Sequence, residues 1–171
     1  GTSRETQADV ETGVDAGNRP VYRVQVGAFR NRYYAERFSV HTKPYPGISE
    51  LLSQLAKREI RTAVVSNKPD EFTRKIIDAL FAPGTFEFVA GGSDTIPKKP
   101  DPVLVNRCME QLDVPKRLCC YCGDSNVDMI TARNAGILSV GAAWGFRGEE
   151  ELKEAGADYI IRSPLELLDV L

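Results

Sequence analysis

One short stretch of the chain concentrates side chains that could do chemistry. Residues 119–128 read CCYCGDSNVD, so three cysteines are followed by Asp124 and Asp128. Thiolates suit zinc in a closed site of four ligands, whereas carboxylate oxygens suit a harder cation such as Mg²⁺. The first question is therefore which of the two sets, if either, holds a metal.

The cysteines favour a packing role. Zinc would need a second pair of ligands at a useful distance, and His41, the only histidine, lies far upstream. Cysteines clustered late in a chain are a poor disulfide framework, so reduced thiols are expected. Residues 118–122, LCCYC, form an apolar run that ends at a glycine, which is typical of a buried parallel strand. Because neighbouring strand residues point to opposite faces, we expect the thiols to pack on both faces of a sheet.

Strands and helices are predicted to alternate around this run. Apolar residues recur with helical spacing at about 45–60, 72–80, 104–112, 127–135, 148–155 and 164–170. Apolar runs predict strands in RTAVVSN, FEFVAGG, LCCYCGD, ILSVGAA and ADYII. Short connections between them indicate an α/β fold, with a mostly parallel sheet that helices cover on both faces.

Polar residues follow two of the predicted strands. Ser66 and Asn67 end one strand, and Gly123, Asp124 and Ser125 end another. Open parallel sheets bind ligands at the carboxyl ends of their strands. We therefore expect these two ends to be neighbours across a crevice.

Composition limits the function classes. The chain has 171 residues, of which 42% are hydrophobic and 27% charged, as in a single globular domain. Its formal net charge of −2 provides no basic face for nucleic acid. No apolar run of about 18 residues and no signal-peptide pattern is present. We expect a cytoplasmic protein that contacts neither nucleic acid nor membrane.

Three motifs together resemble a known superfamily. Residues 66–68 (SNK), 98–102 (KKPDP) and 123–128 (GDSNVD) resemble the second, third and fourth motifs of the haloacid dehalogenase (HAD) superfamily. TKPYPGI, VVSNKP, WGFRG and GADYII resemble segments of its phosphoglycolate phosphatase branch, so that the resemblance covers roughly residues 41–171. It implies a three-layer Rossmann-like core and Mg²⁺-dependent hydrolysis of phosphate monoesters through an aspartyl-phosphate.

The resemblance also implies roles for five residues. The Ser66 hydroxyl and the Asn67 backbone N–H would donate hydrogen bonds to phosphoryl oxygens, and Lys99 would neutralise charge. Asp124 would ligate Mg²⁺ directly, while Asp128 would hold a metal-bound water or orient its neighbours. Each residue also has a purely structural interpretation: a turn for Ser66 and Asn67, a solvated charge for Lys99, a helix N-cap for Asp124 and a first-turn dipole partner for Asp128. Their occurrence together favours the functional interpretation.

The sequence departs from the superfamily at its first motif. That motif, an apolar strand ending in Asp-x-Asp-Gly-Thr, supplies the nucleophile and the general acid and base. The nearest approach here, residues 9–13 (DVETG), follows no apolar strand. About 40 residues precede the recognisable core, too few for the helical cap of this branch. We expect a truncated phosphatase that is inactive by itself.

Three segments follow from this interpretation. Residues 1–19 are polar without apolar periodicity and are expected to be flexible or weakly ordered. Residues 20–43, with aromatic residues at helical spacing in FRNRYYAERF, are expected to be the remnant of a cap helix and its linker. Residues 44–171 are expected to form the α/β core.

Two alternatives remain open. Residues 21–38 also resemble the opening strand and helix of a SPOR domain, a bacterial peptidoglycan-binding module. A strand at 22–28 followed by a turn would favour that module, and one helix running to about 40 would favour the cap remnant. The other alternative is a non-catalytic relative that keeps the phosphate cradle as a binding or scaffold protein.

Caps select substrates in this superfamily, and most of the cap is missing here. The expected substrate is therefore open among a small phosphorylated organic acid, a phosphorylated sugar and pyrophosphate. A core without its cap and first strand would expose apolar surface. That exposure predicts homo-oligomers.

Overall fold

The computed structural model describes residues 21–24 and 43–171, which form an α/β fold. Its elements, in chain order, are β1 (Val21–Val24), α3 (Ile48–Lys57), β2 (Ala63–Pro69), α4 (Asp70–Leu80), β3 (Phe88–Gly92), α5 (Val103–Gln111), η1 (Lys116–Leu118), β4 (Cys119–Gly123), α6 (Asn126–Ala135), β5 (Leu138–Ala142), α7 (Gly148–Glu154), β6 (Tyr159–Ile161), η2 (Pro164–Glu166) and α8 (Leu167–Val170).

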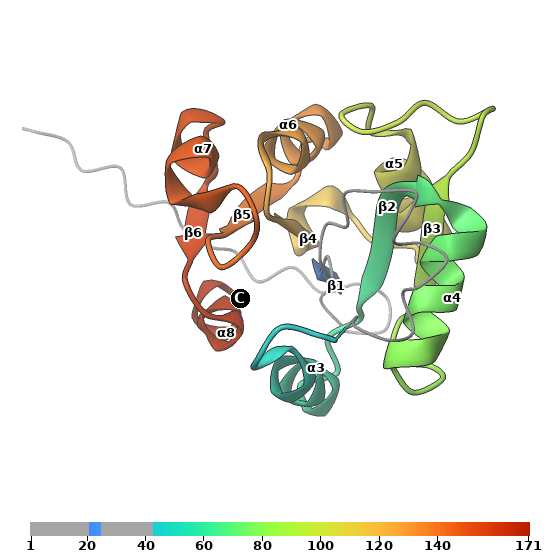
Figure 1. The fold of residues 1–171 in the computed structure, drawn as a ribbon, viewed down its shortest axis with the longest axis horizontal. Helices are drawn as coiled ribbons and strands as arrows, with labels where there is room; N and C mark the ends of the chain where they lie inside the picture. The colour runs from blue at the N-terminus through green and yellow to red at the C-terminus, as the bar shows by residue number, and fades with distance from the viewer. Residues whose placement is uncertain (1–20, 25–42) are drawn as a thin grey trace, which may run out of the picture.

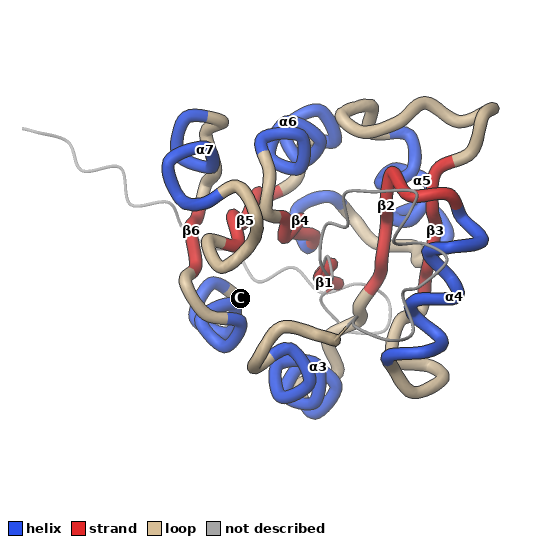
Figure 2. The backbone as a smooth tube through the Cα atoms, in the orientation of Figure 1, coloured by secondary structure: helices blue, strands red, loops and turns tan. Residues whose placement is uncertain are grey.

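All neighbouring strands in the described sheets run parallel. One sheet has the order β1-β4-β5-β6, and the other pairs β2 with β3. Strand β1 also contacts β2, and it lies between β4 and β2 in Figure 1. Helices α5 and α6 lie on one side of the strands and α3 and α8 on the other (Figure 2). The predicted α/β class, with a parallel sheet between helical layers, is confirmed.

Strand β4 separates two hydrophobic cores. Cys119 and Tyr121 pack in the core that includes residues of α5 and α6, whereas Cys120 and Cys122 pack in the core that includes residues of α3 and α8. All four cysteines of the chain are buried, and none of them forms a disulfide. This confirms the predicted alternation and the packing role of the thiols. Burial, with a smaller effect of Cys108, raises the pKa of Cys119 to about 12, so the thiol stays neutral.

Helix α3 follows from its apolar spacing. Ile48, Leu51, Leu52 and Leu55 are all buried, and they share a core with Leu167 of α8. Burying one such side chain stabilises a fold by about 1.5–3 kcal/mol. Burial of these four side chains therefore holds α3 against the core, as the sequence predicts.

Helix α6 starts directly behind β4. Ser125 is its N-cap, and Gly136 ends it in the left-handed conformation with φ of 70°. Glycine adopts this conformation without the steric cost of a Cβ. The predicted position of Gly136 is confirmed, and the start of α6 brings its first turn to the carboxyl end of β4.

Strand β2 is longer than the sequence predicts. It continues past Asn67 to Pro69, and its register with β3 shifts between Val65 and Pro69. A Cβ on Gly92 of β3 would lie 2.8 Å from the Asn67 carbonyl oxygen, so only glycine leaves room for this irregular stretch. The shift places Asn67 within the strand and beside the loop that precedes α5.

Residues 21–24 differ from the predicted cap remnant. They form a strand that pairs in parallel with β4, with Val24 opposite Cys122, so they belong to the sheet. Valine and tyrosine fit an extended strand better than a helix, and this preference is realised here. The predicted helix in FRNRYYAERF and the segment 1–19 lie outside the described residues. The rest of the cap-remnant and SPOR interpretations stay predictions.

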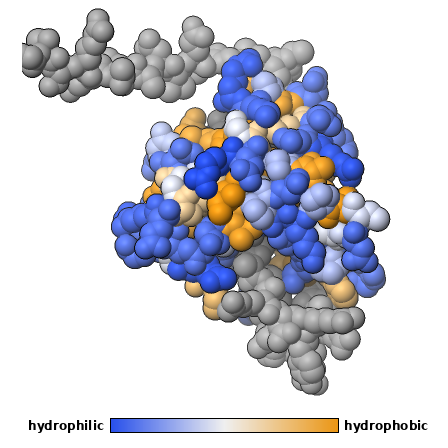
Figure 3. Space-filling model, turned by 90° about the horizontal axis from the view of Figure 1, so that it is seen from above, coloured by the Kyte–Doolittle hydropathy of each residue, from blue (hydrophilic) through white to orange (hydrophobic). Residues whose placement is uncertain are grey.

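The face of the molecule that is seen from above is largely polar (Figure 3). Seen from above the view of Figure 1, hydrophilic residues surround small hydrophobic patches (Figure 3). Within residues 21–24 and 43–171, no helix has the length and apolar character needed to cross a membrane. The predicted homo-oligomers stay a prediction.

Candidate functional site

Asp128, in the first turn of α6, is the centre of a buried hydrogen-bond network. Its Oδ1 accepts hydrogen bonds from Lys99 Nζ at 2.7 Å and from the Tyr121 hydroxyl at 3.2 Å. Its Oδ2 accepts from Ser125 Oγ at 2.8 Å and from the Asp124 backbone N–H at 3.2 Å. Four donors therefore hold this carboxylate in one orientation.

The glycine before Asp124 makes the network possible. A Cβ on Gly123 would lie 2.7 Å from Asp128 Oδ2, closer than real Cβ atoms come to such an oxygen. Asp128 therefore packs directly against the end of β4. A larger residue at position 123 would displace the carboxylate.

Asp124 is the first residue after β4 and lies against a second glycine. Its Oδ2 accepts a hydrogen bond of 3.4 Å from the Phe146 backbone N–H, and a Cβ on Gly145 would lie 2.7 Å from the same oxygen. Its Oδ1 is buried and has no hydrogen-bond partner among the described residues. Because Ser125 is the N-cap of α6, the helix-cap interpretation of Asp124 is wrong.

The electrostatic environment of Asp124 suits a bound cation. Burial raises the pKa of Asp124, the charge of Asp128 raises it further, and two backbone N–H groups and Lys99 act in the opposite direction. Two buried carboxylates thus face one buried ammonium. A buried carboxylate oxygen without a donor is costly, and a hard cation would satisfy it.

Asn67 holds Lys99 in place through two hydrogen bonds. The Lys99 backbone N–H donates to Asn67 Oδ1 at 2.7 Å, and Asn67 Nδ2 donates to the Lys99 carbonyl oxygen at 3.1 Å. This pair fixes the loop before α5 to β2, from where the Lys99 side chain reaches Asp128. The ends of β2 and β4 are therefore neighbours, as predicted, and Lys99 connects them through its hydrogen bonds to Asn67 and Asp128.

Ser66 precedes Asn67 in the sequence but makes a different local contact. Its Oγ accepts a hydrogen bond of 3.1 Å from the Lys68 backbone N–H. The hydroxyl proton of Ser66 is not used in that bond. Hydrogen bonds thus join Asn67, Lys99, Asp124 and Asp128, whereas Ser66 lies beside the group in β2.

Tyr121 and Phe146 also contribute to this site, although the sequence motifs do not indicate them. Tyr121 bonds Asp128, and its ring centroid lies 5.8 Å from Lys99 Nζ. A tyrosine inside an otherwise apolar run indicates a polar contact in the core, because a buried phenol needs a hydrogen-bond partner. Phe146 contributes through its backbone N–H, for which residue types give no signal.

The donor set fits Mg²⁺ through one carboxylate. Among residues 21–24 and 43–171, no group of three or more His, Cys, Asp or Glu side chains is arranged to hold a metal. Mg²⁺ often keeps several waters and uses one or two carboxylates together with substrate phosphate. Asp124 Oδ1 meets that requirement.

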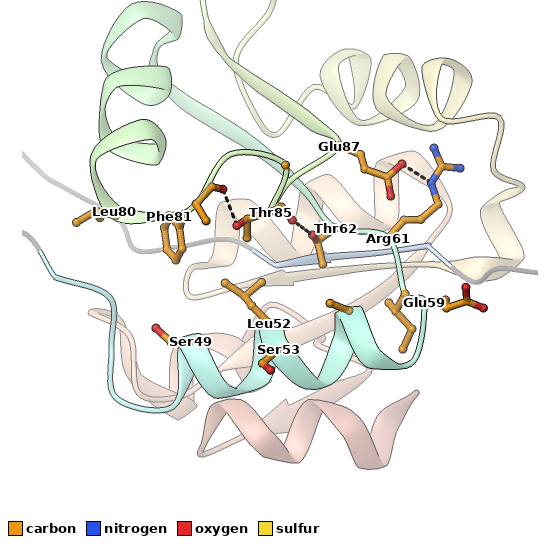
Figure 4. A pocket seen from close by; sticks show the side chains of 14 residues that line it. Ser49, Leu52, Ser53, Glu59, Arg61, Thr62, Leu80, Phe81, Thr85 and Glu87 are labelled. Atoms are coloured by element: carbon orange, nitrogen blue, oxygen red, sulfur yellow. Dashed lines mark hydrogen bonds and ion pairs between the residues drawn. The ribbon is translucent and has the colours of Figure 1, made fainter.

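A separate hollow lies at the amino end of β2. It has a volume of about 550 Å³ and is lined by residues of α3, of the end of α4, and of the loops that precede β2 and β3. Two internal pairs line it, Arg61 with Glu87 at 2.9 Å and Thr62 with the Thr85 carbonyl oxygen at 2.6 Å (Figure 4). None of the predicted site residues lines this hollow.

Sequence comparison relates the chain to known proteins. A family model described as haloacid dehalogenase-like hydrolase matches residues 6–142. The phosphoglycolate phosphatase of Aquifex aeolicus is 33% identical over 146 residues, which cover 85% of this chain and 67% of the relative. The phosphoglycolate phosphatase of Vibrio parahaemolyticus is 32% identical, with coverage of 81% and 61%.

Structural comparison agrees with the sequence comparison. A crystal structure from Lactobacillus delbrueckii matches with a TM-score of 0.76 and 38% identity, over 81% of this chain and 57% of that one. The structure of CbbY from Rhodobacter sphaeroides in complex with phosphate matches with a TM-score of 0.66 and 28% identity, over 80% and 63%. The chain thus spans about three fifths of the length of several of these relatives. Since the family model covers most of its residues, the chain belongs to the haloacid dehalogenase-like hydrolase family.

Proposed function

We propose that the chain carries the phosphate-binding and Mg²⁺-binding part of a phosphomonoesterase of the phosphoglycolate phosphatase type. The observation that carries this proposal is the buried Lys99–Asp128 pair beside Asp124, whose Oδ1 lacks a partner among the described residues. Two relatives named phosphoglycolate phosphatase support the substrate class, a small phosphorylated organic acid.

Each residue then has a distinct task. Lys99 neutralises phosphoryl oxygens, and Asp128 keeps its ammonium in place, because the Asp128 oxygens already accept four hydrogen bonds. Ser66 donates its free hydroxyl proton to a phosphoryl oxygen, with the neighbouring N–H of Asn67. Asp124 holds Mg²⁺, which when bound stabilises negative charge on the phosphoryl group. This geometry favours the orienting role of Asp128 over direct metal ligation.

Among the residues that the structure describes, the network contains no carboxylate left over for nucleophilic attack. Asp124 faces the metal position and Asp128 is fully hydrogen-bonded, so neither fits an attacking group. We therefore infer that the chain binds phosphate but does not hydrolyse phosphomonoesters by itself. A non-catalytic phosphate-binding relative would also bind phosphate without hydrolysing phosphomonoesters.

Calorimetric titration with inorganic phosphate in the presence of Mg²⁺ tests the proposal. The chain should bind phosphate, and Lys99→Met should weaken binding by about tenfold or more because a charge-assisted contact is lost. Lys98→Met removes an exposed neighbouring charge and should leave binding unchanged. Equal loss in both variants, or none, would contradict the assignment of Lys99.

Turnover of p-nitrophenyl phosphate tests the inferred inactivity. We expect no Mg²⁺-dependent hydrolysis above background. Hydrolysis that Asp124→Ala abolishes would show that the chain itself supplies a nucleophile.

A further inference from the structure

The loop between β5 and α7 brings an exposed aromatic ring to the edge of the site. Phe146 is 65% exposed, more than any other large hydrophobic side chain in the described part of the chain. Its own backbone N–H nevertheless donates to Asp124 Oδ2. An apolar ring is thus kept in solvent next to the proposed metal ligand.

The position of this loop relative to Asp124 is fixed. The Gly145 N–H donates to the Ala142 carbonyl oxygen at 3.1 Å, which closes a turn at the end of β5. Gly145 lies so close to Asp124 that a Cβ would collide with the carboxylate. The backbone of residues 145 and 146 therefore rests on Asp124, and the side chains that follow are presented at the rim.

Arg147 adds a cation to the same rim. Its guanidinium lies 6.0 Å from the centroid of the Phe146 ring, and 42% of its side chain is exposed. Its ion pair with Glu151 is long, at 3.6 Å, and such exposed pairs contribute little. Glu151 also accepts a hydrogen bond of 3.0 Å from the Asn126 backbone N–H. The guanidinium can therefore exchange this partner for a ligand at small cost.

We propose that Phe146 and Arg147 form a ledge that binds the part of the substrate beyond its phosphoryl group, with Arg147 pairing a carboxylate. This inference rests on the proposed phosphate site at Lys99 and Asp124. A small ester anchored there extends its remaining atoms toward the rim. A planar guanidinium binds a carboxylate through two parallel hydrogen bonds, and the aromatic ring stacks on the guanidinium and covers a short carbon chain. The ledge thus selects phosphate esters that carry a carboxylate.

Two matched ligands test the ledge, phosphoglycolate and ethyl phosphate, which share length and phosphate but differ in the carboxylate. Calorimetry with Mg²⁺ should show tighter binding of phosphoglycolate, by about tenfold. Arg147→Ala should remove this preference while leaving the affinity for ethyl phosphate within about twofold, and Arg147→Lys should keep part of it. Arg107→Ala, on the exposed face of α5, controls for the lost charge and should preserve the preference.

The outcomes separate the ledge from the phosphate site. Wild-type chain that binds both esters equally, or a preference that survives Arg147→Ala, would overturn the ledge and leave the phosphate site standing. Loss of both ligands in Arg147→Ala to the same extent would also overturn it, because the arginine would then act on the phosphate. Wild-type chain that binds neither ester would contradict the proposed function and the ledge with it.

Discussion

Lys99 Nζ lies 2.7 Å from Asp128 Oδ1, and the two side chains are only 6% and 1% exposed. This ion pair joins the loop before α5 to the first turn of α6. Removing one partner of a buried pair leaves an uncompensated charge, which is more damaging than losing an exposed pair. The pair therefore links stability and the proposed phosphate binding at one position.

Asp128→Asn should be strongly destabilising for this reason. We expect a loss of about 3–5 kcal/mol in the free energy of unfolding, measured with urea. Lys99→Met combined with Asp128→Asn should recover part of the loss, because no unpaired charge remains. Asp78→Asn, an exposed position on α4, serves as control. A loss below about 1 kcal/mol in Asp128→Asn would show that the pair is not buried as described.

Gly145→Ala should impair metal binding more than stability. The added Cβ would displace the Asp124 carboxylate, so Mg²⁺ affinity measured by calorimetry should fall by about tenfold or more. Gly84→Ala is the matched control, because its φ of 81° strains alanine while no atom lies within 4 Å of the new Cβ. That variant should lose stability and keep Mg²⁺ affinity. Equal Mg²⁺ affinity in the two variants would contradict the close approach of residue 145 to Asp124.

Several features of the fold could be predicted from local patterns. The structure confirms the apolar face of α3, the alternation of LCCYC side chains between the two cores and the end of α6 at Gly136. Each of these features depends on short-range spacing. The proximity of Asp124, Asp128 and Lys99 could be predicted because their motifs occur together, and their roles stay predictions. The hydrogen bonds that Asn67 makes to Lys99 depend on a register shift in β2, which no local pattern encodes. The strand at Val21–Val24 cannot be recognised from local patterns, because its partner, β4, lies almost a hundred residues away.

Asp70 should make stability depend on pH. The Arg74 side chain and then the Gly91 backbone N–H hold the pKa of Asp70 below its usual value of 3.8. A depressed pKa in the folded state means that the stabilisation is present above pH 3.8 and is lost as the pH falls through the lower, folded value. Asp70→Asn should therefore be less stable than wild type at pH 6, and the difference should shrink toward pH 2. A difference that stays constant in urea unfolding over this range would contradict the assignment.

The four cysteines should resist modification in the folded chain. All are buried, and a thiol with a pKa near 12, as for Cys119, supplies almost no thiolate at pH 8. Ellman's reagent should react slowly with native chain and rapidly with four thiols in guanidinium. Because the folded pKa lies above the unfolded value of 9.0, stability should also fall as the pH rises beyond 9. A fast-reacting thiol in native chain would contradict the burial of β4.

Asp124 is the proposed Mg²⁺ ligand, and calorimetric titration of Mg²⁺ tests this role most directly. In the presence of inorganic phosphate, the wild-type chain and the exposed control Asp78→Asn should bind one Mg²⁺ with the same affinity, whereas Asp124→Asn should show no measurable binding while unfolding cooperatively in urea. Mg²⁺ binding that is unchanged in Asp124→Asn would contradict the role of Asp124 as the Mg²⁺ ligand.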